Sequence, residues 1–148
     1  MNWILDPVLI FSFHGKLNFS EDLPIFKRIY LGGEGLVRGY SPIPTENPVQ
    51  TAEKIEVEEF LFQSIQLQFT LLRRKDFGRI EFGIDGLIFG DYGTGTLTSQ
   101  KFKLSDSIFG YGFGVRLFLS GINYIGLDLG FNPYTSTPRL HLSKYAKF

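Results

Sequence analysis

The sequence predicts an all-β protein built from antiparallel strands that share one apolar face. Six segments alternate apolar and polar residues with period 2, the spacing of strands rather than of helices. The 148 residues include 16 Phe, 7 Tyr and 17 Gly, and a chain so rich in aromatic residues and glycine favours strands. No apolar run approaches the roughly 20 residues that a membrane-spanning helix needs.

The first three segments cover residues 9–19, 64–71 and 79–91. Their apolar positions are Leu9, Phe11, Phe13, Leu17 and Phe19, then Ile65, Leu67, Phe69 and Leu71, then Ile80, Phe82, Ile84 and Ile88. Polar residues such as Ser12, Gln66 and Asp91 fill alternate positions. Because successive side chains of a strand point to opposite faces, each segment is expected to present one apolar and one polar face.

The last three segments cover residues 107–119, 125–131 and 139–148. Their apolar positions are Phe109, Tyr111, Phe113, Val115 and Leu117, then Ile125, Leu127, Leu129 and Phe131, then Leu140, Leu142 and Phe148. Gly110, Gly112 and Gly114 lie at period 2 on the polar face, where close backbone packing explains them better than a phosphate-binding loop.

The connections between these segments differ in length. Short turns are expected at residues 73–76, 121–123 and 132–133, and long connections at about 20–60 and 94–106. Short turns at one end and long loops at the other are typical of outer-membrane barrels. The turn near Ile122 is expected to bring Arg116 opposite Asp128 on the polar face, as a structural cross-strand ion pair.

The alternation does not tell whether the apolar face meets lipid or a protein core. A membrane barrel points this face outward and fills its lumen with polar groups. A small soluble β-barrel or sandwich that binds an apolar ligand would instead bury it. Six strands are too few to close a membrane barrel, since the smallest have about eight. The membrane interpretation therefore makes residues 1–148 one part of a larger barrel.

Composition and motifs argue against several other classes of function. Lys and Arg together number 15, as do Asp and Glu, and this zero net charge argues against a nucleic-acid partner. The chain has no cysteine, and its histidines, His14 and His141, accompany no cluster of metal ligands. No Gly-x-Ser-x-Gly motif is present. We expect no catalytic residue, cofactor or metal here, although an enzymatic domain such as a lipase upstream stays possible.

Three motifs carry a family resemblance. Val37-Arg38-Gly39-Tyr40 lies in a glycine-rich stretch, Phe89-Gly90-Asp91-Tyr92-Gly93 ends a strand segment, and the last residue is Phe148. They resemble the BamA/TamA/FhaC-like superfamily of outer-membrane barrels that assemble or secrete proteins, also described as the bacterial surface antigen domain. The resemblance spans nearly the whole chain and extends to the segments 110–116 and 125–130.

The resemblance implies an antiparallel transmembrane β-barrel of about sixteen strands, of which residues 1–148 form the C-terminal six. In this family the long loop, here about residues 20–60, folds into the lumen and its arginine bonds an acid on the wall. That implies a contact between Arg38 and Asp91, with Phe89 and Gly93 in the same motif. Gln66 stands where relatives carry a second acid, so we expect Arg38 to bind one acid rather than two, unless a different register lets Glu56, Glu58 or Glu59 supply the second.

The resemblance also implies a non-enzymatic mechanism in the outer membrane. The last strand, ending at Phe148, is expected to form a seam with the first strand, where an incoming strand can add to the free edge. The implied partners are outer-membrane lipid, unfolded client or secreted polypeptides, and accessory assembly proteins. Insertion and export remain equally open. The N-terminus lacks a signal peptide, so we expect the targeting signal to lie upstream in a longer chain.

Overall fold

The computed structural model describes residues 6–17, 29–33, 35–41, 56–78, 80–96, 107–120 and 124–145. Their strands are β1 (Val8–Lys16), β2 (Ile29–Tyr30), β3 (Glu56–Val57), β4 (Glu59–Phe77), β5 (Ile80–Thr96), β6 (Ser107–Leu119), β7 (Tyr124–Asn132) and β8 (Thr135–Tyr145). Among the described residues, no helix has the length and apolar character needed to cross a membrane.

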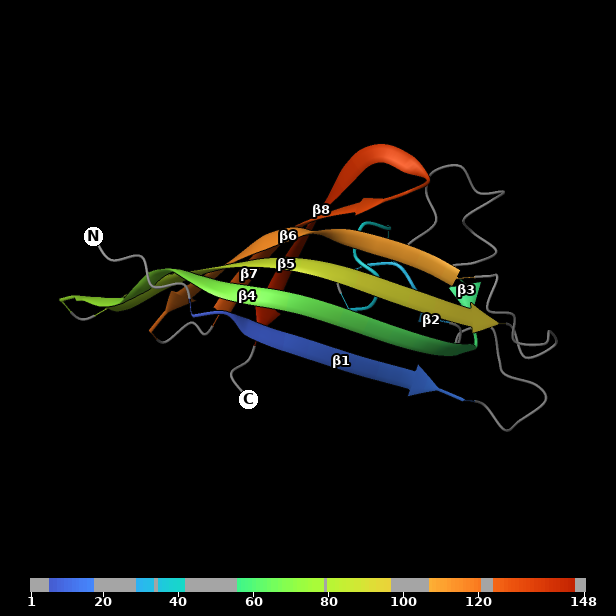
Figure 1. The fold of residues 1–148 in the computed structure, drawn as a ribbon, viewed down its shortest axis with the longest axis horizontal. Coiled ribbons are helices and arrows are strands. Elements are labelled where there is room, and N and C mark those ends of the chain that lie inside the picture. The colour runs from blue at the N-terminus through green and yellow to red at the C-terminus, as the bar shows by residue number, and fades with distance from the viewer. Residues whose placement is uncertain are drawn as a thin grey trace.

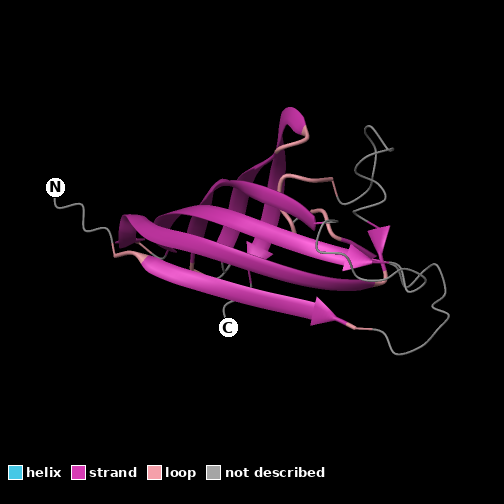
Figure 2. Ribbon diagram, turned by 45° about the vertical axis from the view of Figure 1, so that its right-hand side comes forward, coloured by secondary structure: helices cyan, strands magenta, loops and turns pink. Residues whose placement is uncertain are grey.

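The main strands form one antiparallel sheet, which confirms the predicted fold class. Its six strands follow the order β1-β4-β5-β6-β7-β8, and the short strands β2 and β3 pair only with each other in the described part of the chain. The sheet is strongly curved, with β1, β4 and β5 in front and β8 crossing behind them in Figure 1. Figure 2 shows the same strands as a single curved layer.

The hairpin of β4 and β5 is longer than the sequence pattern predicts. A turn was expected at residues 73–76, but β4 continues to Phe77 and β5 begins at Ile80. Register shifts between Thr70 and Leu72 and between Leu72 and Lys75 accommodate this charged stretch within the strand. Gly78 supplies the turn with φ of 69°, a left-handed conformation that glycine adopts without strain.

The connections fall at two ends of the sheet, which we call the loop end and the turn end. The connections β1–β4, β5–β6 and β7–β8 lie at the loop end, and β4–β5 and β6–β7 at the turn end, because neighbouring strands are antiparallel. The short turn at residues 132–133 therefore lies with the long connections, and grouping it with the other short turns was wrong. The expected turn at 121–123 lies outside the described residues.

The outer face of the sheet carries the predicted apolar side chains. Leu9, Phe11 and Leu140 are 67%, 66% and 69% exposed, and no second sheet covers them in the described part of the chain. On β6 and β7, the rings of Tyr111 and Phe131 stack with their centroids 5.8 Å apart. Such a continuous apolar face is unfavourable in water and favours an apolar environment, which counts against the soluble sandwich.

The inner face carries a small apolar core in addition to its polar groups. The segment 29–41, without residue 34, is called the inner loop because it lies against this face. Two backbone hydrogen bonds close a turn within it: Val37 N donates to Leu31 O at 2.8 Å and Gly33 N donates to Val37 O at 3.1 Å. The core consists of Leu31, Val37, Tyr40, Val57, Phe60, Phe62 and Ile108. This packing explains why some apolar residues point inward.

Candidate functional site

The inner loop carries Arg38 onto the carboxylate of Asp91 in β5. Arg38 donates to Asp91 from its backbone N at 3.0 Å, from Nε at 2.7 Å and from Nη2 at 2.8 Å. The side chain of Arg38 is 4% exposed and that of Asp91 is fully buried. A fork of charge-assisted bonds in such a dry site fixes both position and orientation of the guanidinium.

A second carboxylate, from Asp128 in β7, also binds Arg38. Arg38 Nη1 donates to Asp128 Oδ2 at 3.0 Å. Asp128 in turn accepts from Arg116 of β6, whose Nη1 bonds Oδ1 and whose Nη2 bonds Oδ2 at 2.8 Å. Arg116 faces Gly126 directly, so its pair with Asp128 is diagonal rather than directly opposite. Two arginines and two aspartates thus form one buried cluster without net charge.

Ser64, rather than Gln66, completes the contact with Arg38 on the β4 side. Ser64 faces Asp91 across the β4–β5 ladder; its Oγ donates to Asp91 Oδ1 at 2.6 Å and accepts from Arg38 Nη2 at 3.3 Å. Gln66 donates to Ser64 Oγ at 3.4 Å. The expectation of a single acid was therefore wrong, because the second acid comes from β7, 90 residues along the chain from Arg38.

An aromatic ring and several glycines shape the space around Arg38. Its Cζ lies 3.5 Å from the centroid of the Phe89 ring, close enough for a cation–π contact. A Cβ added at Gly110 would collide with the carbonyl oxygen of Arg38, and one at Gly93 would come 2.6 Å from Val37 Cγ2. The glycines on the inner face therefore let the inner loop lie directly on the sheet.

The next residue, Gly39, is held through its own peptide groups. Its N donates to His141 Nε2 in β8 at 3.0 Å, and its O accepts from Asn132 Nδ2 in β7 at 2.6 Å. Its φ of 97° lies in the left-handed region, and an added Cβ would come 2.5 Å from Phe131 O. Only glycine fits this position without strain. Tyr40 follows and donates from its hydroxyl to Phe109 O at 2.9 Å.

Burial shifts the pKa of two ionisable groups of the inner loop, Arg38 and Tyr40. Burial opposes the charge of Arg38, but the hydrogen bonds and charges of Asp91 and Asp128 outweigh it and raise the pKa of Arg38. Burial has the opposite effect on Tyr40, whose pKa it raises, and this keeps the hydroxyl protonated as a donor. Among the described residues, no group of three or more His, Cys, Asp or Glu could hold a metal ion.

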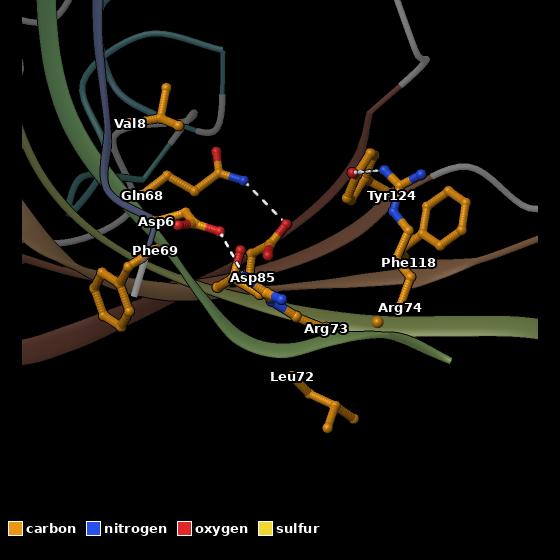
Figure 3. A pocket seen from close by; sticks show the side chains of 12 residues that line it. Asp6, Val8, Gln68, Phe69, Leu72, Arg73, Arg74, Asp85, Phe118 and Tyr124 are labelled. Carbon is orange, nitrogen blue, oxygen red and sulfur yellow. Dashed lines mark hydrogen bonds and ion pairs between the residues drawn. The ribbon is translucent and has the colours of Figure 1, made fainter. Parts of the chain in front are cut away.

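Near the turn end, a separate pocket of about 350 Å³ is lined by another arginine, Arg74 of β4 (Figure 3). Its Cζ lies 3.9 Å from the centroid of the Phe118 ring, and its Nη2 donates to the hydroxyl of Tyr124 at 2.6 Å. Gly83 lies beneath it, where an added Cβ would be 3.0 Å from Arg74 Cγ. Gln68 and Asp85 also line the pocket, and Gln68 donates to Asp85 at 3.2 Å.

The structure brings most of the expected site residues together. The inner-loop motif Val37, Arg38, Gly39 and Tyr40 meets Phe89, Asp91 and Gly93 of β5 and the pair Arg116 and Asp128. Phe148 lies outside the described residues. Sequence reasoning missed Ser64, Asn132 and His141. The alternation of their segments indicated that Ser64 and His141 face inward, but it did not indicate which residues they bind.

Comparisons with known proteins give one result. The model of the Omp85 superfamily domain matches residues 2–139. The comparisons with curated proteins and with solved structures returned no match. The matched range includes the whole inner loop, both acids of the buried cluster and the strands that carry them. The chain therefore belongs to the Omp85 superfamily.

Proposed function

We propose that this chain forms the C-terminal part of an outer-membrane barrel that inserts or exports other polypeptides, with the inner loop clamped to the lumen wall. Omp85 superfamily proteins are outer-membrane proteins that serve insertion or secretion in general. The observation that carries the proposal is Arg38, which bonds Asp91 of β5 and Asp128 of β7 at once while almost fully buried.

The clamp connects the loop to two strands that are not neighbours. β6 lies between β5 and β7, and its Gly110 and Gly114 leave room for Arg38 and Asp128. Because the acids are fixed in the sheet, the guanidinium holds the loop against the inner face. Removing Arg38 would leave the buried carboxylate of Asp91 without the arginine that neutralises it, which costs about 3–5 kcal/mol. A loop held so firmly would narrow the lumen and brace its wall.

The edges of the sheet support the larger barrel. In the described part of the chain, β1 pairs only with β4 and β8 only with β7. Unpaired backbone groups are not tolerated in lipid, so both edges require further strands. The seam would lie at the free edge of β8, where an incoming extended segment could add by strand pairing. The outward apolar face, with Leu9, Phe11 and Leu140 exposed, would contact lipid.

The proposed partners are unfolded client or secreted polypeptides and accessory assembly proteins, and the proposed role is non-enzymatic. Members of the superfamily act as transporters or assembly factors rather than as enzymes. The buried cluster fits this role, because its two arginines and two aspartates neutralise one another and none is poised as an exposed acid, base or nucleophile.

The test compares Arg38→Ala and Asp91→Ala with the control Arg73→Ala in the full-length protein. Arg73 is a matched control, since its side chain is 61% exposed and makes a long 3.5 Å pair with Asp6. Fractionated cells would report outer-membrane content, a heat-dependent gel shift would report barrel folding, and insertion or secretion of client proteins would report activity. We expect Arg38→Ala and Asp91→Ala to reduce folded barrel and client handling, and Arg73→Ala to leave both unchanged. Wild-type behaviour of Arg38→Ala and Asp91→Ala would overturn the clamp.

A further inference from the structure

One peptide of the inner loop is tied to the last strand of the sheet. Gly39 N donates to His141 Nε2 of β8 at 3.0 Å, while Gly39 O accepts from Asn132 of β7 at 2.6 Å. His141 is 7% exposed and Asn132 is 6% exposed, so water does not readily replace either bond. The tip of the loop therefore has a direct connection to β8 as well as the one to β5 and β7 through Arg38.

The close seat of Gly39 on β7 gives this connection little freedom. An added Cβ at Gly39 would come 2.5 Å from Phe131 O, and one at Gly130 would collide with Gly39 N. The peptide thus lies flat on β7, and the His141 side chain reaches it from the adjacent strand. A small shift of β8 relative to β7 would lengthen the bond at once, because neither the peptide nor the buried ring can follow freely.

A pocket lies beside His141, between the inner loop and β8. This pocket separates the inner-loop residues Tyr30, Gly32, Gly33, Gly35 and Leu36 from residues 140–142 of β8. The loop is therefore not packed tightly against β8 along this stretch. The hydrogen bond at His141 bridges the two beside this space. Because Nε2 accepts this bond, the ring must be neutral with its proton on Nδ1.

We propose that His141 is a positioning residue that couples the inner loop to β8, so that displacement of the last strand loosens the loop and release of the loop loosens the strand. The inference rests on the proposed function, in which β8 borders the seam. It adds a specific link by which the state of the seam is transmitted to the lumen. Coupling of this kind is reciprocal in free energy, so it can be tested from either side.

The first test measures release of the loop through a cysteine at Val37, a fully buried loop position. This chain has no cysteine of its own, so Val37→Cys provides a single reactive thiol in it. Parent, His141→Leu, His141→Gln and Arg38→Ala would be compared in the full-length protein, all in the Val37→Cys background. The readout is the rate of labelling by a water-soluble maleimide. His14→Leu is the matched control, because His14 is an exposed histidine on β1.

We expect His141→Leu to raise the labelling rate roughly tenfold, the effect of leaving one buried N–H without an acceptor. His141→Gln should restore slow labelling, because its amide oxygen can accept the same bond. Arg38→Ala should raise the rate further, and His14→Leu should not change it. Fast labelling in Arg38→Ala but not in His141→Leu would overturn the coupling and leave the clamp intact. Unchanged labelling in both would overturn the clamp itself.

The second test separates coupling from simple stabilisation of β8. Amide hydrogen exchange of peptides covering residues 135–145 would be measured for His141→Leu, Arg38→Ala and the double variant. We expect each single substitution to speed exchange, and the double variant to exchange no faster than Arg38→Ala, because a released loop no longer holds His141. Additive effects would mean that His141 stabilises β8 independently of the loop, and would overturn the inference.

Discussion

Two arginines, Arg38 and Arg74, lie on the inner face of the same sheet, and their positive charges are stabilised by different kinds of partner. Arg38 is almost fully buried and binds the carboxylates of Asp91 and Asp128. Arg74 is exposed near the turn end, stacks on Phe118 and donates to a neutral tyrosine hydroxyl. Where water is present, aromatic rings suffice; where water is excluded, the charge needs full counter-charges.

The difference also extends to what each arginine connects. Arg38 belongs to the inner loop and joins it to strands 53 and 90 residues away. Arg74 belongs to β4 and reaches over Gly83 of β5 to Phe118 of β6 and Tyr124 of β7, within the sheet itself. The first contact fixes a separate segment onto the wall. The second reinforces a wall that its backbone ladder already holds together.

The largest expected effect comes from removing the acid shared by two buried arginines. Asp128→Ala removes the carboxylate that binds both guanidinium nitrogens of Arg116 and one of the two carboxylates that bind Arg38, and we expect it to lower the free energy of unfolding by about 3–5 kcal/mol. Tyr124→Phe, which removes the hydroxyl that binds Arg74, should cost less than about 1 kcal/mol. Urea unfolding of the full-length protein in detergent micelles would measure both. Equal losses would contradict the contrast between the two regions.

A second effect concerns the shape of the cation. Lysine keeps the charge but cannot reach Asp91, Asp128 and Ser64 together, so Arg38→Lys should cost about 1.5–3 kcal/mol. Arg74→Lys retains a cation over the Phe118 ring and should cost less than about 1 kcal/mol. The same unfolding measurement applies. If lysine were tolerated equally at both positions, charge rather than fork geometry would account for the Arg38 site.

A third effect compares the glycines beneath the two arginines. A Cβ at Gly110 would collide with a backbone oxygen of Arg38, so Gly110→Ala should cost about 1–3 kcal/mol and expose the inner loop to protease. A Cβ at Gly83 would meet the flexible Cγ of Arg74 at 3.0 Å, and Gly83→Ala should cost less than about 1 kcal/mol. Gly90→Ala is the control, because its nearest neighbour would be at 3.7 Å.

The smallest expected effect lies at the exposed pair beside Arg74. Arg73 and Asp6 are 61% and 65% exposed and 3.5 Å apart, so Asp6→Asn should change the free energy of unfolding by no more than about 0.5 kcal/mol. Raising the salt concentration should abolish even this difference, whereas the cost of Asp128→Ala should persist. A strong salt dependence of the Asp128→Ala cost would show that water enters the buried cluster.

Much of the fold follows from period 2 in the sequence. The alternation placed Asp91, Asp128 and His141 on the inner face and Leu9, Phe11 and Leu140 on the outer face, and the structure agrees. It failed at residues 70–75 of β4, because register shifts there break the period and let Arg74 turn inward. A bulge leaves no trace in a pattern of apolar residues, so the turn was expected too early.

The site was predictable in its parts but not in its assembly. The loop motif and its acid stand out as residues, yet the meeting of Arg38 with Asp128 depends on the register of β5, β6 and β7 and on the depth to which the loop sinks. That depth is set by glycines on the inner face and by an apolar core that includes Phe60. None of these distances is encoded in local spacing, so Gln66 was assigned the place that Ser64 and Asp128 fill.

In the sequence, the inner loop comes before the residues that bind its Arg38 and Gly39. Its contacts from Arg38 and Gly39 reach forward along the chain by 53, 90 and 102 residues. A polypeptide is made from its N-terminus, so the loop exists long before its seat, and contacts of such separation are slow to form. A seated loop can appear only after synthesis has passed His141 and the last strands have found their register. Docking of the inner loop therefore reports that the strands from β4 to β8 have already been made and paired.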